Sequence, residues 1–226
     1  MNLTFEPFLL SLVAGMATGI GGVIALLLGK LSDRVAGFSL GFASGVMLLV
    51  SFNNLFLEAQ QLITHFLLIA AFSLGVLIIG ALDLILPHVE LTAKENSSKT
   101  RIYMAGLLIA MGITLHNFPE GFAVAAGYAY LPRLGMIIAI AIMLHNIPEG
   151  IATAVPLSMA GMKRLRTAIV TFLSGLAEPV GALIGAVALS IAATPIAIGS
   201  SLAFAAGVMT YITAPLQTIG ERSLRR

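Results

Sequence analysis

Two near-identical hexapeptides stand in the middle of two apolar runs, where polar side chains are costly: HNFPEG at residues 116–121 and HNIPEG at residues 145–150. In a helix, the histidine and the glutamate of each copy are four residues apart, so both side chains project from one face. The asparagine, three residues before the glutamate, adds a neutral oxygen on a neighbouring part of that face. Each copy therefore offers an imidazole, an amide oxygen and a carboxylate to one partner.

The proline before each glutamate bears on the shape of the helix. Pro119 and Pro148 lack an N–H, and each ring crowds the carbonyl four residues earlier, at Leu115 and Leu144. A kinked, partly unwound helix at membrane depth is tolerated where it lines a cavity. We therefore expect both helices to be kinked and partly unwound where they line a cavity.

A third carboxylate is expected at the same depth. His116, His145 and Glu178 each lie about 14 residues into an apolar run, which is roughly 21 Å along a helix. Three ionised acids would cost on the order of 9 kcal/mol if they were left unpaired in lipid. No Lys or Arg occurs at that depth. The remaining solutions are protonation, a water-filled cavity or bound cations.

Seven polar side chains thus converge on one layer, and their types indicate the cation. Imidazoles beside carboxylates and amide oxygens suit borderline divalent metals such as Zn²⁺, Fe²⁺, Mn²⁺, Co²⁺ or Ni²⁺, whereas an all-oxygen Mg²⁺ or Ca²⁺ site would not need histidine. The donors exceed the needs of one ion, so two adjacent ions bridged by Glu120 and Glu149 are expected. The thioether of Met47 is a candidate weak ligand. The layer comprises His116, Asn117, Glu120, His145, Asn146, Glu149 and Glu178.

The same residues have a less specific interpretation. A single histidine within the membrane is more often a hydrogen-bonded packing residue than a ligand, but two copies of the hexapeptide with a third acid at equal depth favour a metal centre. Glu58 and Asp83 stand near the ends of apolar runs. Solvation at the membrane interface explains them as well as a role in ion transit does, so both readings stay open.

Composition defines the protein class. Of the 226 residues 58% are hydrophobic and only 10% are charged, with a mean hydropathy of +1.02. Soluble domains carry about 25% charged residues, so the chain is an integral membrane protein, and α-helices are the spans that its apolar runs predict. The absence of cysteine excludes disulfides, thiolate metal sites and thiol catalysis. We expect an all-α single transmembrane domain over residues 1–226, with spans at about 7–29, 35–60, 64–88, 102–129, 131–158, 165–191 and 195–219.

The basic residues predict the orientation. Arg133 alone falls on one side of the membrane, so that side is outside, with the N-terminus, and the C-terminus is cytoplasmic. Because the basic residues lie in short loops between spans, the net charge of +2 gives no reason to expect nucleic-acid binding. The other side holds Lys30, Arg34, Lys94, Lys99, Arg101, Lys163, Arg164, Arg166, Arg222, Arg225 and Arg226.

Internal repeats predict an inverted topology. LGFASGVM at residues 40–47 matches LAFAAGVM at residues 202–209 at six of eight positions, and a weaker match relates residues 15–21 to 175–181. The matched spans run in opposite directions, which is typical of transporters with a substrate site at the repeat interface. The same offset predicts a partner for the third span that would begin near residue 226. Either the protein has seven spans by design, or an eight-helix design lacks one helix through loss or truncation; we favour the second.

At these motifs the chain resembles the ZIP family of divalent metal transporters, specifically its bacterial zinc-uptake branch. The resemblance implies an eight-helix, three-plus-two-plus-three fold and a binuclear metal centre between the fourth and fifth helices. Carried over by position, one metal site would use Met47, His116, Glu120 and Glu149. The other would use Asn117, Glu120, His145, Asn146, Glu149 and Glu178. Thr213-Ala214-Pro215 stands where the family often has an acidic cluster.

The sequence therefore predicts a transporter and not an enzyme: divalent metal, with zinc foremost and iron, manganese, cobalt or cadmium as further substrates, enters the cytoplasm through the midplane centre. The transported ion occupies the site, and no resident cofactor is expected. The partners are the metal ions and the lipid bilayer of the inner membrane, with a homodimer left open. The alternatives are an intramembrane metal-dependent hydrolase, which the absence of His-Glu-x-x-His disfavours, and a truncated, non-transporting metal-binding remnant or sensor.

Overall fold

A computed structural model describes residues 4–29, 33–85 and 98–224, and within these ranges it is helical with no strand. The end of the expected third span beyond residue 85 and the polar loop up to residue 97 lie outside the described residues. The elements are α1 (Phe5–Leu28), α2 (Asp33–Leu49), the π-helix η1 (Val50–Phe56), α3 (Leu57–Leu62), α4 (His65–Ile85), α5 (Ser98–Tyr130), α6 (Pro132–Met159), α7 (Arg164–Gly175), α8 (Ala177–Ile191) and α9 (Pro195–Leu224).

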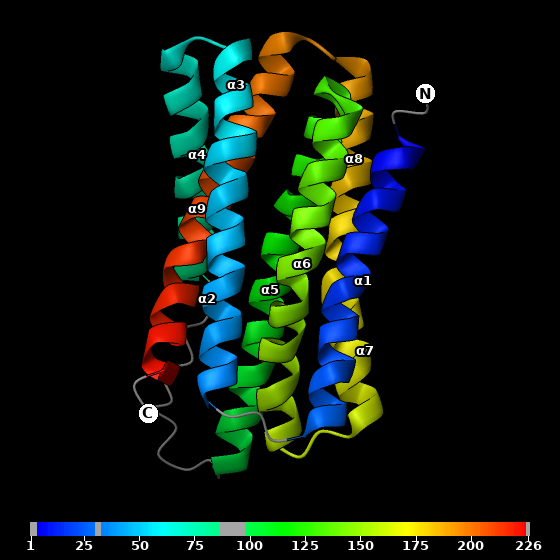
Figure 1. Cartoon of the computed structure of the whole chain (residues 1–226), viewed down its shortest axis with the longest axis vertical. Coiled ribbons are helices and arrows are strands. Elements are labelled where there is room, and N and C mark those ends of the chain that lie inside the picture. Colours follow the sequence, from blue (N-terminus) through cyan, green and yellow to red (C-terminus); the bar gives the residue numbers. More distant parts are fainter. Residues whose placement is uncertain (1–3, 30–32, 86–97, 225–226) are drawn as a thin grey trace.

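Seven helical stretches of the described chain are long and apolar enough to cross a membrane, which confirms the expected all-α polytopic fold. The second of these, Gly37–Leu62, combines α2, η1 and α3, and the sixth, Arg164–Ile191, combines α7 and α8. The N-terminal and C-terminal ends of the chain lie at opposite ends of the bundle (Figure 1). An odd number of crossings accounts for that arrangement.

The expected unwinding at the hexapeptides is wrong. Helices α5 and α6 continue as α-helix through Pro119 and Pro148. Both prolines lie on helices packed among several neighbours, so the loss of one backbone hydrogen bond does not break the helix. The interruption comes instead at Leu176, between α7 and α8, where Pro179 fits the first turn of a new helix because the N–H groups there need no helical partner.

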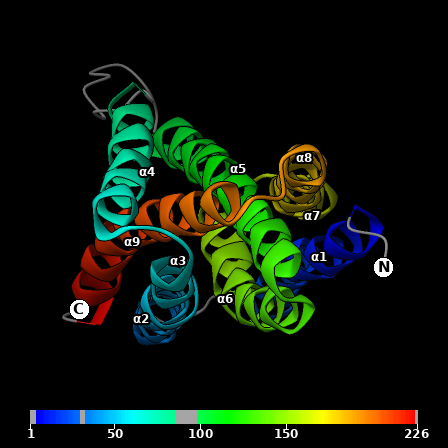
Figure 2. The same cartoon turned by 90° about the horizontal axis from the view of Figure 1, so that it is seen from above.

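The helices form two groups. One contains α1, α5, α6, α7 and α8, and the other contains α2, η1, α3, α4 and α9 (Figures 1 and 2). The groups meet mainly where α2 packs on α6 and where α5 packs on α9. Large apolar side chains cover the outer faces of the bundle, with Phe66 84% and Leu27 77% exposed, as expected for helices surrounded by lipid.

Glycines allow close contact between α1 and α6, and equivalent glycines allow the same close contact between α8 and α5. A Cβ at Gly121 would overlap the Glu178 carbonyl of α8, and a Cβ at Gly150 would overlap the Thr18 carbonyl of α1. The reverse contacts correspond as well, since Gly181 lies against the Phe118 carbonyl and Gly21 against the Ile147 carbonyl. Small residues at these positions let the backbones touch. The equivalent residues of these contacts are those matched by the weaker sequence repeat, in which residue 15 aligns with residue 175. The pair α1 and α6 is therefore related to the pair α8 and α5 by a pseudo-twofold axis.

We predict that Gly150→Ala lowers the melting temperature of the purified protein in detergent, whereas Gly45→Ala leaves it unchanged or slightly raised. The new methyl group at residue 150 would meet a backbone oxygen that cannot rotate away, while nothing lies within 4 Å of a methyl group at Gly45. Overpacking of this kind costs about 1–3 kcal/mol or more. Equal melting temperatures for the two variants, followed by circular dichroism, would show that α1 and α6 do not touch at Gly150.

Candidate metal centre

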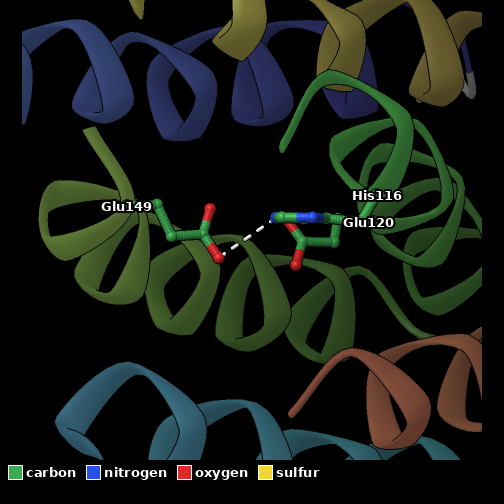
Figure 3. A group of neighbouring side chains, drawn as sticks. All are labelled: His116, Glu120 and Glu149. Atoms are coloured by element: carbon green, nitrogen blue, oxygen red, sulfur yellow. Dashed lines mark ion pairs between the residues drawn. The ribbon is translucent and has the colours of Figure 1, made fainter. Parts of the chain in front are cut away.

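The two hexapeptides pair with one another across the interface of α5 and α6. His116 Nε2 lies 3.1 Å from Glu149 Oε1, and His145 Nε2 lies 3.0 Å from Glu120 Oε1. Each histidine therefore faces the glutamate of the other copy. Figure 3 shows His116 and Glu120 projecting from α5 toward Glu149 on α6. All four side chains are buried, with His116 the most exposed at 7%.

Backbone carbonyls one helical turn earlier hold the two imidazole rings. His145 Nδ1 donates to the Ala141 carbonyl oxygen at 3.1 Å, and the His116 ring bonds the Gly112 carbonyl. A proton on Nδ1 leaves Nε2 of the same ring with its lone pair. Such hydrogen bonds are typical of metal-binding histidines, because they fix the tautomer and the direction of the ligand atom.

Three residues of the hexapeptides, His116, Glu120 and Glu149, each offer a ligand atom within 4.8 Å of the other two, close enough to hold one metal ion. His116 Nε2 and Glu149 Oε1 approach to 3.1 Å, yet neither atom is in a hydrogen bond. Two donors bound to one tetrahedral zinc at 2.0–2.2 Å would lie roughly 3.3–3.6 Å apart. The observed 3.1 Å is slightly shorter than that range, so a small separation of the two side chains would let both atoms bind one cation.

The asparagines are oriented by helices that flank the hexapeptides. The Asn117 amide nitrogen donates to the Ser174 carbonyl at 3.0 Å, and that of Asn146 donates to the Ala14 carbonyl at 2.9 Å and to a Glu178 carboxylate oxygen. With the NH₂ groups engaged in this way, the Oδ1 atoms of both asparagines have no donor. Each amide therefore presents an acceptor to the centre.

Seven buried atoms of this layer have no hydrogen-bond partner, and all are suited to accept a proton or bind a cation. A buried polar atom without a partner costs about 1–3 kcal/mol, and more when it is charged. In the described chain no Lys or Arg pairs with these carboxylates. A cation-free centre is therefore unfavourable in a way that bound metal would relieve. The atoms are His116 Nε2, Asn117 Oδ1, Glu120 Oε2, Asn146 Oδ1, Glu149 Oε1 and Oε2, and Glu178 Oε2.

The structure brings most of the expected ligands together. His116 contacts Glu149, His145 contacts Glu120 and Asn146 contacts Glu178, while Asn117 contacts the end of α7. Met47 is fully buried on α2 in an apolar cluster, and its role as a ligand stays a prediction. Glu58 lies partly exposed on α3, and the Asp83 side chain is outside the described residues.

Sequence reasoning missed the two carbonyl oxygens that orient the asparagines. They belong to Ala14 and Ser174, the residues that directly precede Gly15 and Gly175 in the weaker repeat. That repeat was the available signal, because equivalent positions in an inverted repeat make equivalent contacts. The missed groups are backbone atoms, which residue types alone do not reveal.

Comparisons with known proteins agree with this geometry. The family described as ZIP Zinc transporter matches residues 88–214. The chain is 42% identical over 223 residues to a protein named Zinc transporter ZupT from Chlorobium luteolum, covering 91% of this chain and 84% of that protein. Proteins of the same name from Corynebacterium efficiens and Streptococcus mutans are 39% and 36% identical, covering 94% and 92% of this chain and 85% and 84% of theirs. The seven-span chain with its buried His–Glu pairs belongs to the ZIP family.

Proposed function

We propose that the protein carries divalent transition-metal ions, zinc foremost, across the membrane into the cytoplasm through the centre between α5 and α6. The observation that supports this most strongly is the set of seven partnerless buried acceptors on one layer. The donor set of two imidazoles, three carboxylates and two amides suits Zn²⁺ and its neighbours Fe²⁺, Mn²⁺, Co²⁺ and Cd²⁺. The relatives are named zinc transporters, so we infer a transporter and not an enzyme. Neither the relatives' names nor the site supports the hydrolase or the sensor alternative.

Binding exchanges protons and water for protein ligands. The 3.0 Å contact between His145 Nε2 and Glu120 Oε1 holds a proton between two groups that are also metal ligands. An arriving cation takes the place of that proton, and its departure lets the two side chains bond again. Because this pairing competes with the metal, the centre can release its ion, which transport requires.

Movement of one helix group against the other would expose the centre to each side in turn. The ligand-bearing helices α5, α6 and α8 all belong to the group that also contains α1 and α7, so the centre travels as one unit. The sliding surfaces are those between α2 and α6 and between α5 and α9. We further propose that the centre holds two metal ions bridged by Glu120 and Glu149. We also propose that the chain forms a single domain in the inner membrane with its N-terminus outside, either as a monomer or as a homodimer.

The test is zinc flux. The purified chain in liposomes that contain a zinc-sensitive dye should give saturable zinc entry, reduced by excess Cd²⁺ but not by excess Mg²⁺, because Mg²⁺ prefers oxygen ligands and keeps its water. Protein-free liposomes serve as the control. Zinc that binds in proportion to protein and never reaches the interior would refute transport.

A further inference from the structure

The pseudo-twofold relation reaches beyond the hexapeptides and pairs Thr18 of α1 with Glu178 of α8. Aligning residue 15 with 175 places these two at the same position. The structure shows the correspondence twice. The carbonyl of Glu178 fills the space beside Gly121 and the carbonyl of Thr18 fills that beside Gly150. The carbonyl four residues before each, at Ser174 and at Ala14, accepts the amide of one hexapeptide asparagine.

The Thr18 hydroxyl is fully buried and has no hydrogen-bond partner. Buried hydroxyls in helices usually donate to the carbonyl one turn earlier, as Thr153 does to Glu149 at 3.0 Å and Ser51 does to Met47 at 2.7 Å. For Thr18 that carbonyl is Ala14. Its oxygen already accepts the helical N–H and the Asn146 amide, and these use both of its lone pairs. The hydroxyl is therefore left free.

This arrangement makes the centre asymmetric in charge. On one side, the Glu178 carboxylate bonds Asn146 and keeps one partnerless oxygen. On the equivalent side, the Thr18 hydroxyl and the Asn117 Oδ1 atom are both buried and partnerless. Strict symmetry would place a fourth carboxylate at residue 18, and the chain has a neutral oxygen there instead. Ser11 of α1 is also buried without a partner, so the feature that distinguishes Thr18 is its equivalence to Glu178, together with the partnerless Asn117 Oδ1 on the same side.

Resting on the proposed function, we propose that Thr18 is a specificity-determining residue of the metal centre: its hydroxyl supplies a neutral oxygen to the transported ion, directly or through a bound water, and keeps the carboxylates at three. Fewer carboxylates beside two imidazoles favour borderline ions such as Zn²⁺ over harder ions such as Mn²⁺. The class of ligand is a divalent transition-metal cation in partial exchange with water.

The hydroxyl is tested by initial zinc uptake into liposomes. Thr18→Val keeps the shape and removes the hydroxyl, and it should raise the KM for zinc about five- to tenfold, the loss of one hydrogen bond or ligand contact. Thr18→Ser, which keeps the hydroxyl but loses the methyl group, should recover most of that loss. If Thr18→Val does not insert, Thr18→Ala removes the hydroxyl with less bulk. A wild-type KM in the Val or Ala protein, or a Ser protein impaired as strongly as Val, would overturn the proposal.

Selectivity gives a second readout that a purely structural role would not change. Thr18→Glu adds a fourth carboxylate and should raise the ratio of Mn²⁺ uptake to Zn²⁺ uptake at least fivefold. An unchanged ratio would contradict the proposal. Glu120→Ala is measured beside these variants. If Glu120→Ala loses uptake while Thr18→Val matches wild type, only the role of Thr18 fails. If Glu120→Ala keeps uptake, the proposed site fails, and the role of Thr18 fails with it.

Discussion

We expect zinc uptake to fall at least 100-fold when Glu120 is replaced by glutamine. The Glu120 carboxylate touches His145 of α6 at 3.0 Å and lies within ligand range of His116 and Glu149, so it joins both halves of the centre. Glutamine keeps its volume and one carbonyl oxygen but loses the charge. A hundredfold loss corresponds to about 2.7 kcal/mol, which is within the range for removing one charged ligand from a buried site.

The measurement is the initial rate of zinc entry into liposomes at fixed protein content, with folding checked by gel filtration. Glu6→Gln is the matched control, because Glu6 lies in the first turn of α1, is partly exposed and is far from the ligand layer. The control should keep the wild-type rate. Uptake by Glu120→Gln at that same rate would mean that the ion does not pass through this centre.

The positions of the spans were predictable because a membrane-spanning helix must be both long enough to cross the bilayer and apolar along that length. All seven expected spans correspond to membrane-capable helices in the described chain. The break in the sixth span and the π-helix at Val50–Phe56 were not predicted. Proline at 119 and 148 was the stronger sequence signal for a break. Packing around those helices overrides it, since the surrounding contacts stabilise the helix more than one lost hydrogen bond destabilises it.

The sequence predicted that the two hexapeptides face one another, but it did not predict which histidine pairs with which glutamate. Spacing within each hexapeptide places His116 with Glu120 and His145 with Glu149 on one helix face, which is a property of a single helix. The structure pairs each histidine with the other copy's glutamate instead. That choice depends on the register of α5 against α6. The close contacts of Gly121 with α8 and of Gly150 with α1 fix the positions of α5 and α6. The spacing of residues within the hexapeptides carries no information about that register.

The unpaired hydroxyl of Thr18 is a second feature that the sequence alone did not predict. Its residue type predicts a hydrogen bond to the carbonyl of Ala14, as for other threonines in helices. An asparagine 132 positions away in the chain takes that carbonyl. Only the tertiary structure shows the competition, although the repeat of residues 15–21 with 175–181 already placed Thr18 opposite Glu178.

Saturating zinc should raise the melting temperature of the wild-type protein, and Glu178→Gln should lose most of that rise without lowering the metal-free value. At a zinc concentration of 100 times Kd, binding stabilises by about 2.7 kcal/mol, roughly 5–10 °C for a chain of this size. Glu178 differs from the other two acids because its described bond is to a neutral amide and not to an imidazole. Glutamine can still accept the Asn146 amide in the metal-free state, but it removes a carboxylate ligand from the zinc-bound state.

Only the zinc-bound state loses an interaction, and this separates a ligand carboxylate from a purely structural one. A buried glutamate that only holds helices together would lower the metal-free melting temperature when replaced and would leave the zinc-induced rise intact, since binding would be unaffected. Differential scanning fluorimetry with and without zinc measures both quantities, and Glu6→Gln should behave as wild type in each. A destabilised metal-free Glu178→Gln protein with the full zinc-induced rise would remove Glu178 from the ligand set and leave a centre built from α5 and α6 alone.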